Sequence, residues 1–191
     1  MKNRVLITGG AGFIGHQVIY RFLRDTSYDV VVLDRLDVSG NLNRIDDILK
    51  ENEEWKKRID FVWHDLKSSI NETLKSQIGK VTHIVHLAAG SHVDRSIEDP
   101  MSFVMDNVVG TTNLLIYAKD YLADELQLFI NFSTDEVFGP APEGIAYGEW
   151  DRYNSGNPYS ASKAGAEEMC LAFANTYSLP IINSHTMNVF G

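Results

Sequence analysis

The stretch TGGAGFIG, residues 8–15, decides the fold of this chain. It follows an apolar run that reads as a strand over residues 4–8, and it opens an amphipathic stretch expected to be helical over residues 12–25. Glycines spaced G-x-x-G-x-x-G at such a junction permit a tight turn, close helix–strand packing and close approach to a pyrophosphate. The positive end of the helix dipole favours phosphate there. The stretch therefore predicts a dinucleotide site that includes Gly9, Gly12, Phe13, Ile14 and Gly15.

Around this stretch, short apolar runs alternate with longer amphipathic ones. Strands are predicted at 4–8, 29–34, 59–63, 82–87, 126–132 and 179–185, and helices at 12–25, 44–57, 68–78, 100–121 and 158–178. A polar loop is expected up to residue 99, and a long loop over 133–157. Alternation of this kind predicts an α/β fold with a doubly wound parallel sheet, here one Rossmann domain over residues 1–191.

Composition narrows the class of protein. The net charge of −9, from 17 basic and 26 acidic side chains, argues against a nucleic-acid surface. The single cysteine, Cys170, excludes an intrachain disulfide and reads as a packed helix residue. No signal peptide or membrane span is visible, so a cytoplasmic protein is expected. His83 and His86 fall on opposite faces of a strand, so no metal site is expected.

Polar and small residues follow the other predicted strands, where ligands of open α/β sheets bind. Asp34 ends the second strand, where a carboxylate can accept both ribose hydroxyls and repel a 2′-phosphate. This favours NAD over NADP, although the adjacent Arg35 leaves NADP open. Asp65 and Leu66 follow the third strand, and the small-residue run Leu87, Ala88 and Ala89 follows the fourth.

Tyr159 and Lys163 lie at i and i+4 near the start of the last predicted helix, on one face of it. A nearby ammonium lowers the pKa of a tyrosine from about 10, so Tyr159 is a plausible base. By spacing alone, an ordinary surface pair is the better interpretation. The glycine loop, and the hydroxyl of Thr134 after the fifth strand, favour catalysis.

Two adjacent carboxylates, Asp135 and Glu136, follow the apolar run at 128–132. Like charges at the end of a buried strand are costly unless they are paired or solvated. A solvated turn explains them structurally. A pair of catalytic groups, one protonated and its neighbour ionised, explains them functionally.

Together these motifs make a family recognisable. TGGAGFIG, the acidic end of strand two, the hydroxyl after strand five and YSASK (159–163) resemble the extended short-chain dehydrogenase/reductase superfamily. The stretches AAGSHVDRSI (88–97) and STDEVFG (133–139) resemble the nucleoside-diphosphate-sugar 4,6-dehydratases, above all those that act on dTDP-glucose. The Thr-Asp-Glu triplet is the specific feature, since the glycine and Tyr–Lys motifs occur throughout the superfamily.

The resemblance implies an NAD-dependent lyase that converts dTDP-glucose to dTDP-4-keto-6-deoxyglucose. Tyr159, helped by Lys163 and Thr134, would take the O4 proton as NAD⁺ takes hydride from C4. Glu136 would remove the C5 proton while Asp135 protonates the departing C6 hydroxyl, and NADH would return hydride to C6. Further cofactor contacts implied are Asp37, Ser39, Gly40, Ser91, Asn107, Ser133, Tyr159 and Lys163. The implied substrate contacts are Ser91, Thr134, Asp135, Glu136, Tyr159 and Asn188.

The sequence departs from the family pattern at several positions. Gly90 stands where glutamate is usual, Phe138 where tyrosine is usual, and Val189 replaces the second of two asparagines. The sequence stops at Gly191, where relatives continue into the sugar-nucleotide-binding domain. We therefore expect the cofactor-binding and catalytic part, with the smaller substrate domain largely absent.

Two other functions stay open at this stage. A superfamily epimerase or decarboxylase would share Tyr159 and Lys163 but would not need Asp135 and Glu136. A non-catalytic NAD-binding or interaction module would need none of these four side chains.

A homodimer is also expected. The predicted helices at 100–121 and 158–178 carry apolar or small residues on more than one face, including Ala161, Ala164, Gly165 and Ala166. The resemblance implies that these helices pair with their twofold mates. The alternative is that the extra apolar residues cap the domain's own core.

Overall fold

The computed structural model describes residues 3–190, and it confirms the predicted fold class. Six parallel strands form one sheet in the order β3-β2-β1-β4-β5-β6. The strands are β1 (Arg4–Thr8), β2 (Asp29–Asp34), β3 (Ile59–Trp63), β4 (His83–His86), β5 (Leu128–Thr134) and β6 (Ile181–Thr186). The α-helices are α1 (Gly15–Asp25), α2 (Asn43–Glu51), α3 (Glu72–Ile78), α4 (Val93–Glu98), α5 (Pro100–Phe103), α6 (Gly110–Tyr121) and α7 (Pro158–Tyr177).

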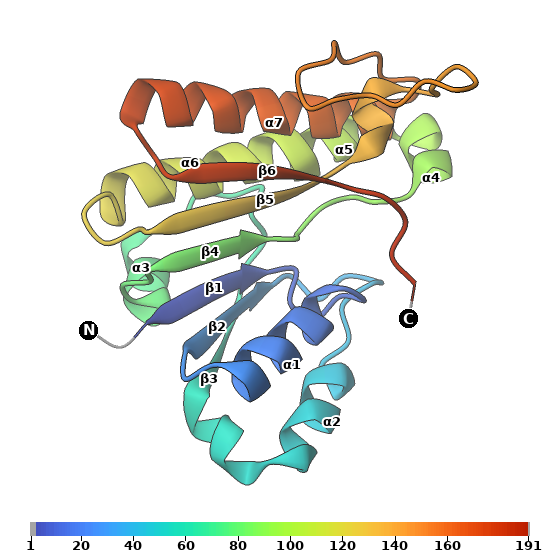
Figure 1. The fold of residues 1–191 in the computed structure, drawn as a ribbon. Helices are drawn as coiled ribbons and strands as arrows, with labels where there is room; N and C mark the ends of the chain where they lie inside the picture. The colour runs from blue at the N-terminus through green and yellow to red at the C-terminus, as the bar shows by residue number, and fades with distance from the viewer. Residues whose placement is uncertain (1–2, 191) are drawn as a thin grey trace.

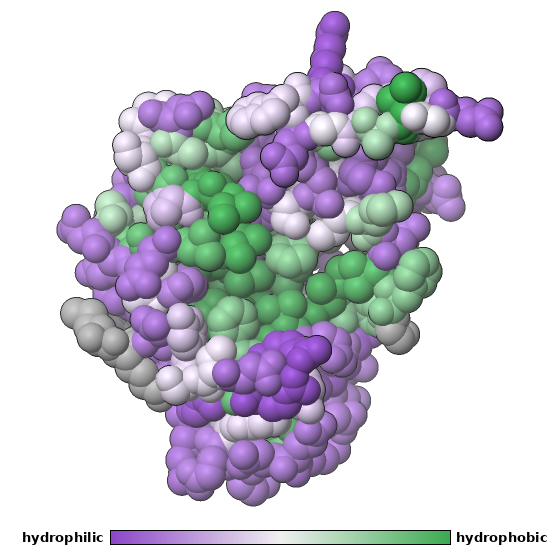
Figure 2. Space-filling view, in the orientation of Figure 1, coloured by the Kyte–Doolittle hydropathy of each residue, from purple (hydrophilic) through white to green (hydrophobic). Residues whose placement is uncertain are grey.

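Helices cover both faces of the sheet (Figure 1). Side chains alternate across β1, so Leu6 enters the core beneath α3, α6 and α7, whereas Val5 and Ile7 enter the core beneath α1 and α2. On the face of the sheet that α1 covers, no helix from residues 3–190 lies over β5 and β6. Hydrophobic side chains gather on that surface (Figure 2), where Ile182 is 54% exposed.

Several predicted boundaries are wrong, each for a local reason. The helix predicted over 44–57 is broken at Asn52, whose extended backbone and side chain begin the 3₁₀ helix η1 (Glu53–Arg58). The expected polar loop before residue 99 contains α4. The helix predicted over 100–121 holds a π-helical segment, η2 (Val104–Val109), between α5 and α6.

The long loop predicted after β5 begins with another short helix. The strand runs on to Thr134, and the 3₁₀ helix η3 (Asp135–Phe138) follows at once. The remaining loop reaches α7, where Asn157 forms a capping box with Ser160 and Pro158 occupies the first turn. These caps fix the start of the helix that carries Tyr159 and Lys163.

Cys170 and His86, for which the sequence predicts no role in a site, are both buried. Cys170 is fully buried, and burial raises the pKa of its thiol to about 12. His86 is hydrogen-bonded between Thr8 and Thr111, and burial lowers its pKa to about 3. Within residues 3–190 no group of three or more His, Cys, Asp or Glu side chains is arranged to hold a metal ion. No helix in that part of the chain has the length and apolar character needed to cross a membrane.

Candidate active site

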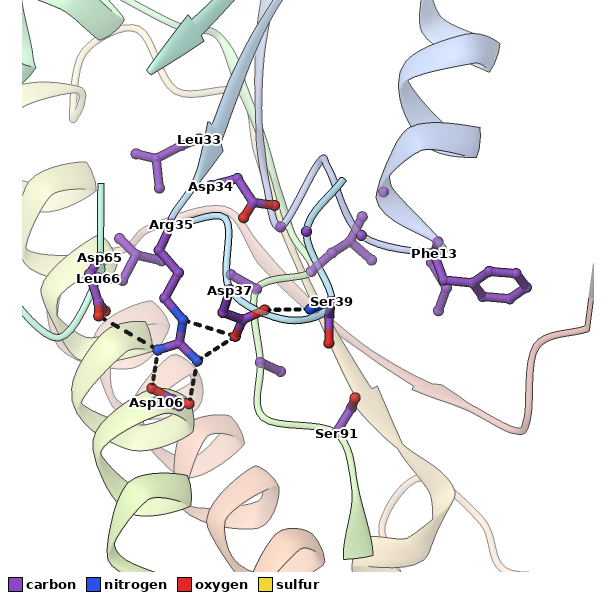
Figure 3. A pocket seen from close by; sticks show the side chains of 18 of the residues that line it. Phe13, Leu33, Asp34, Arg35, Asp37, Ser39, Asp65, Leu66, Ser91 and Asp106 are labelled. Atoms are coloured by element: carbon purple, nitrogen blue, oxygen red, sulfur yellow. Dashed lines mark hydrogen bonds and ion pairs between the residues drawn. The ribbon is translucent and has the colours of Figure 1, made fainter. Parts of the chain in front are cut away.

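A cavity of about 510 Å³ opens at the carboxyl ends of β1 to β4. Figure 3 shows the side chains that line it. Most of the predicted cofactor residues line this cavity: Gly9, Gly12, Phe13, Ile14, Gly15, Asp34, Arg35, Asp37, Ser39, Gly40, Asp65, Leu66, Leu87, Ala88, Ala89 and Ser91. Asn107, Ser133, Tyr159 and Lys163 are not among its lining residues.

The glycine loop is fitted closely to its surroundings. Gly9 has a φ of +69°, and a Cβ there would lie 2.7 Å from the backbone nitrogen of Ala88. A Cβ on Gly15 would overlap the carbonyl oxygen of Gly9. Among the described residues no side chain caps the start of α1. The His16 and Gln17 amides donate to the Gly12 and Ile14 carbonyls, and the positive dipole end of the helix lies at the cavity. This arrangement fits a pyrophosphate.

Asp34 joins the glycine loop to the loop after β2. Its Oδ2 accepts a hydrogen bond from the Ala11 amide at 3.0 Å, and its Oδ1 accepts one from the Leu36 amide at 2.8 Å. Arg44, which the sequence analysis missed, donates from Nη1 to the Ala11 and Ser39 carbonyls at 3.0 and 2.8 Å. Asp34 is 7% exposed, and its remaining lone pairs are free to accept ribose hydroxyls.

A second missed residue, Asp106 on η2, also lines this cavity and pairs with Arg35 (Figure 3). The hydrogen bonds that Arg35 donates to Asp106 are the largest cause of an Arg35 pKa raised above its usual value. No sequence motif points to this pair, because the two residues lie 71 positions apart.

The predicted catalytic side chains meet at the end of β5. The Thr134 hydroxyl caps η3 by accepting from the Glu136 amide at 3.2 Å. Asn157 donates from Nδ2 to Glu136 Oε2 at 3.2 Å while its Oδ1 accepts the Ser160 amide at 2.8 Å. One side chain thus ties a predicted catalytic carboxylate to the start of α7. Asp135 is exposed and accepts a hydrogen bond from Thr134 Oγ1 at 3.3 Å, whereas the less exposed Glu136 is held by Asn157.

Tyr159 lies within reach of these groups, but its pKa differs from the sequence-based expectation. Burial raises the pKa of Tyr159, the Thr134 hydroxyl lowers it, and the Glu136 and Asp135 carboxylates raise it further. The net shift is upward, so the predicted lowering by Lys163 is wrong in this structure. The Lys163 ammonium is directed instead at the Phe132 carbonyl, 2.6 Å away, and burial lowers its own pKa to about 8.

Asn107 was predicted to contact the cofactor, but it does not line the first cavity and instead holds neighbouring parts of the chain together. Its side chain accepts the Gly90 amide at 2.8 Å and donates to the Gly90 carbonyl at 3.1 Å and to Ser162 Oγ at 2.8 Å. A Cβ at Gly90 would lie 3.1 Å from the Phe103 ring, which itself packs edge-on against Tyr159. The departure at Gly90 therefore makes room for Phe103.

Glu167, another residue the sequence analysis missed, lies beneath the predicted catalytic loop. It is fully buried and accepts hydrogen bonds from Ser133 Oγ, from Tyr153 OH at 2.5 Å and from His185 Nε2 at 2.7 Å. Ser133, predicted to touch cofactor, is thus engaged with α7. Phe138 packs against the Tyr153 and His185 rings, with centroids 5.4 and 4.9 Å away, so it joins the same cluster.

Beside this cluster lies a second, larger cavity of about 1250 Å³, which Asp135, Glu136 and Glu167 help to line. Asn188, the remaining predicted substrate contact, is exposed beyond β6 and is not among the residues that line either cavity.

Comparison with known proteins identifies the family. The family model described as GDP-mannose 4,6 dehydratase matches residues 6–191. The chain belongs to the GDP-mannose 4,6 dehydratase family. The predicted resemblance to the nucleotide-sugar 4,6-dehydratases is thereby confirmed. A dTDP-glucose 4,6-dehydratase from Salmonella typhimurium is 37% identical to this chain. The alignment covers 98% of this chain and 55% of the relative.

Solved structures agree with this assignment. A dTDP-glucose 4,6-dehydratase from Streptomyces venezuelae, solved with NAD and TYD bound, superposes with a TM-score of 0.82 at 34% identity, covering 94% of this chain and 54% of that one. A UDP-N-acetylglucosamine 4-epimerase from Methanobrevibacter ruminantium M1 gives a TM-score of 0.83 at 26% identity, covering 100% and 57% of the two chains. The chain thus spans about half the length of these similar proteins.

Proposed function

We propose that the chain is the cofactor-binding and catalytic part of an NAD-dependent nucleotide-sugar 4,6-dehydratase, with dTDP-glucose as the substrate. The observation that carries this proposal is the meeting of Asp135, Glu136, Thr134 and Tyr159 at the end of β5. Epimerases with the same fold need a base at Tyr159, but they have no step that calls for an adjacent acid and base.

The residues around the first cavity support NAD as the cofactor. The uncapped start of α1 suits the pyrophosphate, Asp34 suits the adenosine ribose, and Ala88 and Ala89 leave room for a flat ring. When bound, NAD would accept hydride from C4 of the sugar and later return it to C6.

The chain's own residues would move the protons. Tyr159 would take the O4 proton, with Thr134 as its hydrogen-bond partner. Glu136, oriented by Asn157, would take the C5 proton, which a ketone at C4 makes acidic. Asp135, on the exposed side of the pair, would protonate the departing C6 hydroxyl. A cytoplasmic location is part of the same proposal.

Incubation with dTDP-glucose and NAD⁺ tests this function. We expect a product that has lost one water by mass spectrometry, because dehydration at C5–C6 removes the C6 hydroxyl. An epimerase would leave the mass unchanged. NAD⁺ binding by calorimetry without any turnover would favour a non-catalytic module. The same assay on a chimera with the C-terminal half of the Salmonella relative controls for a missing nucleotide-binding surface.

We also propose a homodimer built on α5, η2, α6 and α7. Several apolar side chains on these helices are exposed: Met101, Val104, Met105, Ile116, Leu171 and Tyr177. Two of the four small residues of α7 pack inside the protomer, whereas Ala161 is exposed. Ala166 is fully buried, and a Cβ on Gly165 would lie 3.1 Å from Val108, so these two residues pack within one protomer.

The substitution Val104→Arg is expected to convert the dimer to a monomer at micromolar concentration, because it places two charges in an isologous interface. Light scattering across a dilution series measures this. Val38→Arg, at a position 86% exposed on another part of the surface, is the control. A wild-type chain that is already monomeric, or a Val104→Arg variant that stays dimeric, contradicts the proposal.

A further inference from the structure

The guanidinium of Arg35 is surrounded by carboxylates in the part of the first cavity beside Asp34 (Figure 3). Asp106 binds it in bidentate fashion, with Nη1 to Oδ1 at 2.5 Å and Nη2 to Oδ2 at 2.8 Å. Asp37 Oδ2 accepts from Nε at 3.1 Å and from Nη2 at 2.8 Å. Asp65 adds an ion pair with Nη1 at 3.6 Å. Each of the three guanidinium nitrogens therefore already has a carboxylate partner.

Asp106 is the best placed of these partners to fix Arg35. Its side chain is 12% exposed, against 41% for Asp37 and 30% for Asp65, so its charge is the least screened by water. It is also the only one of the three carried by the helical layer, on the π-helical segment η2. A planar bidentate pair holds an arginine in one orientation.

The position of Arg35 makes this constraint chemically important. In dinucleotide sites of this fold, the acidic residue at the end of the second strand binds the ribose 2′-hydroxyl, and a nearby arginine accommodates a 2′-phosphate. Asp34 and Arg35 occupy these two places. An arginine whose N–H groups are already paired with carboxylates has few left for a phosphate, and the four aspartates that line this cavity would repel the added dianion. The neighbouring cation Lys67 is itself paired with Asp65 at 3.2 Å and lies 3.9 Å from Asp106.

We propose that Asp106 is a specificity-determining residue of the cofactor site. It holds Arg35 away from the 2′ position, so that the site accepts NAD and rejects NADP. This inference rests on the proposed function, because it assumes that the first cavity binds a nicotinamide dinucleotide. It also explains why the presence of Arg35 next to Asp34 need not lead to NADP binding.

The test is to titrate wild type and the isosteric variant Asp106→Asn with NAD⁺ and with NADP⁺ by calorimetry. We expect wild type to prefer NAD⁺. In Asp106→Asn the affinity for NADP⁺ should rise about tenfold, while that for NAD⁺ changes less than about threefold, because a freed arginine can pair with the 2′-phosphate. Asp120→Asn, on exposed α6 surface, is the matched control and should change neither affinity. Asp106→Ser gives a second variant if Asp106→Asn does not fold.

A double-mutant cycle separates positioning from simple charge. If Asp106 acts through Arg35, then Asp106→Asn should no longer raise NADP⁺ affinity in an Arg35→Gln background. An equal rise in both backgrounds overturns the positioning role. Failure of wild type to bind either cofactor rejects the proposed function. NAD⁺ binding with an unchanged NADP⁺ to NAD⁺ ratio in the Asp106 variants rejects this inference alone.

Discussion

Replacement of Glu136 by glutamine should lower the rate of dehydration by about 100-fold or more while hydride transfer from C4 continues. The amide keeps the size of the side chain and can still contact Asn157, but it cannot take the C5 proton. Reduced cofactor should therefore accumulate, since no C5–C6 alkene forms to take the hydride back. Near-ultraviolet absorbance of the reduced nicotinamide follows it directly, in any form of the protein that turns over dTDP-glucose.

The control for this experiment lies in the same loop. Glu143 is an exposed glutamate of the 139–157 segment, and Glu143→Gln should leave both steps unchanged. A Glu136→Gln variant that forms product at the wild-type rate would refute the role given to Glu136. Loss of hydride transfer as well as dehydration would place Glu136 at the first step, beside Tyr159, in place of the second.

Replacement of Glu167 by alanine should destabilise the domain by about 3 kcal/mol, because it removes the acceptor for three hydrogen bonds in a fully buried place. For a domain of this size that loss lowers the melting temperature by roughly 6–12 °C. Ser133, Tyr153 and His185 would lose their shared partner, so β5, the long loop and β6 would lose their common attachment to α7. Denaturant or thermal unfolding followed by circular dichroism measures the change.

The neighbouring Glu168 provides a matched control, because it lies on the same helix and is exposed. Glu168→Ala should change the free energy of unfolding by no more than about 0.5 kcal/mol. Glu167→Gln should fall between the two, since the amide oxygen still accepts hydrogen bonds but carries no charge. Equal effects of Glu167→Ala and Glu168→Ala would show that the buried cluster does not stabilise the fold.

Much of the fold follows from short-range sequence patterns. The apolar run of β2, the glycines of residues 9–15 and the Asn157-Pro158 start of α7 each specify their structure within a few residues. The break at Asn52 and the helix α4 were harder to predict, because a single capping side chain or a short helical turn leaves little periodic signal.

The sequence by itself determined the doubly wound sheet, the cavity at its carboxyl edge and the meeting of Thr134, Asp135, Glu136 and Tyr159. Backbone propensity, glycine geometry and the alternation of strands and helices act locally, so they are specified by neighbouring residues. Only the tertiary structure decided that Asp106 holds Arg35, that Glu167 anchors the predicted catalytic loop, and that the pKa of Tyr159 is raised. Ion pairs, burial and pKa values depend on which distant side chains meet and how much water is excluded, and neither is fixed by spacing along the chain.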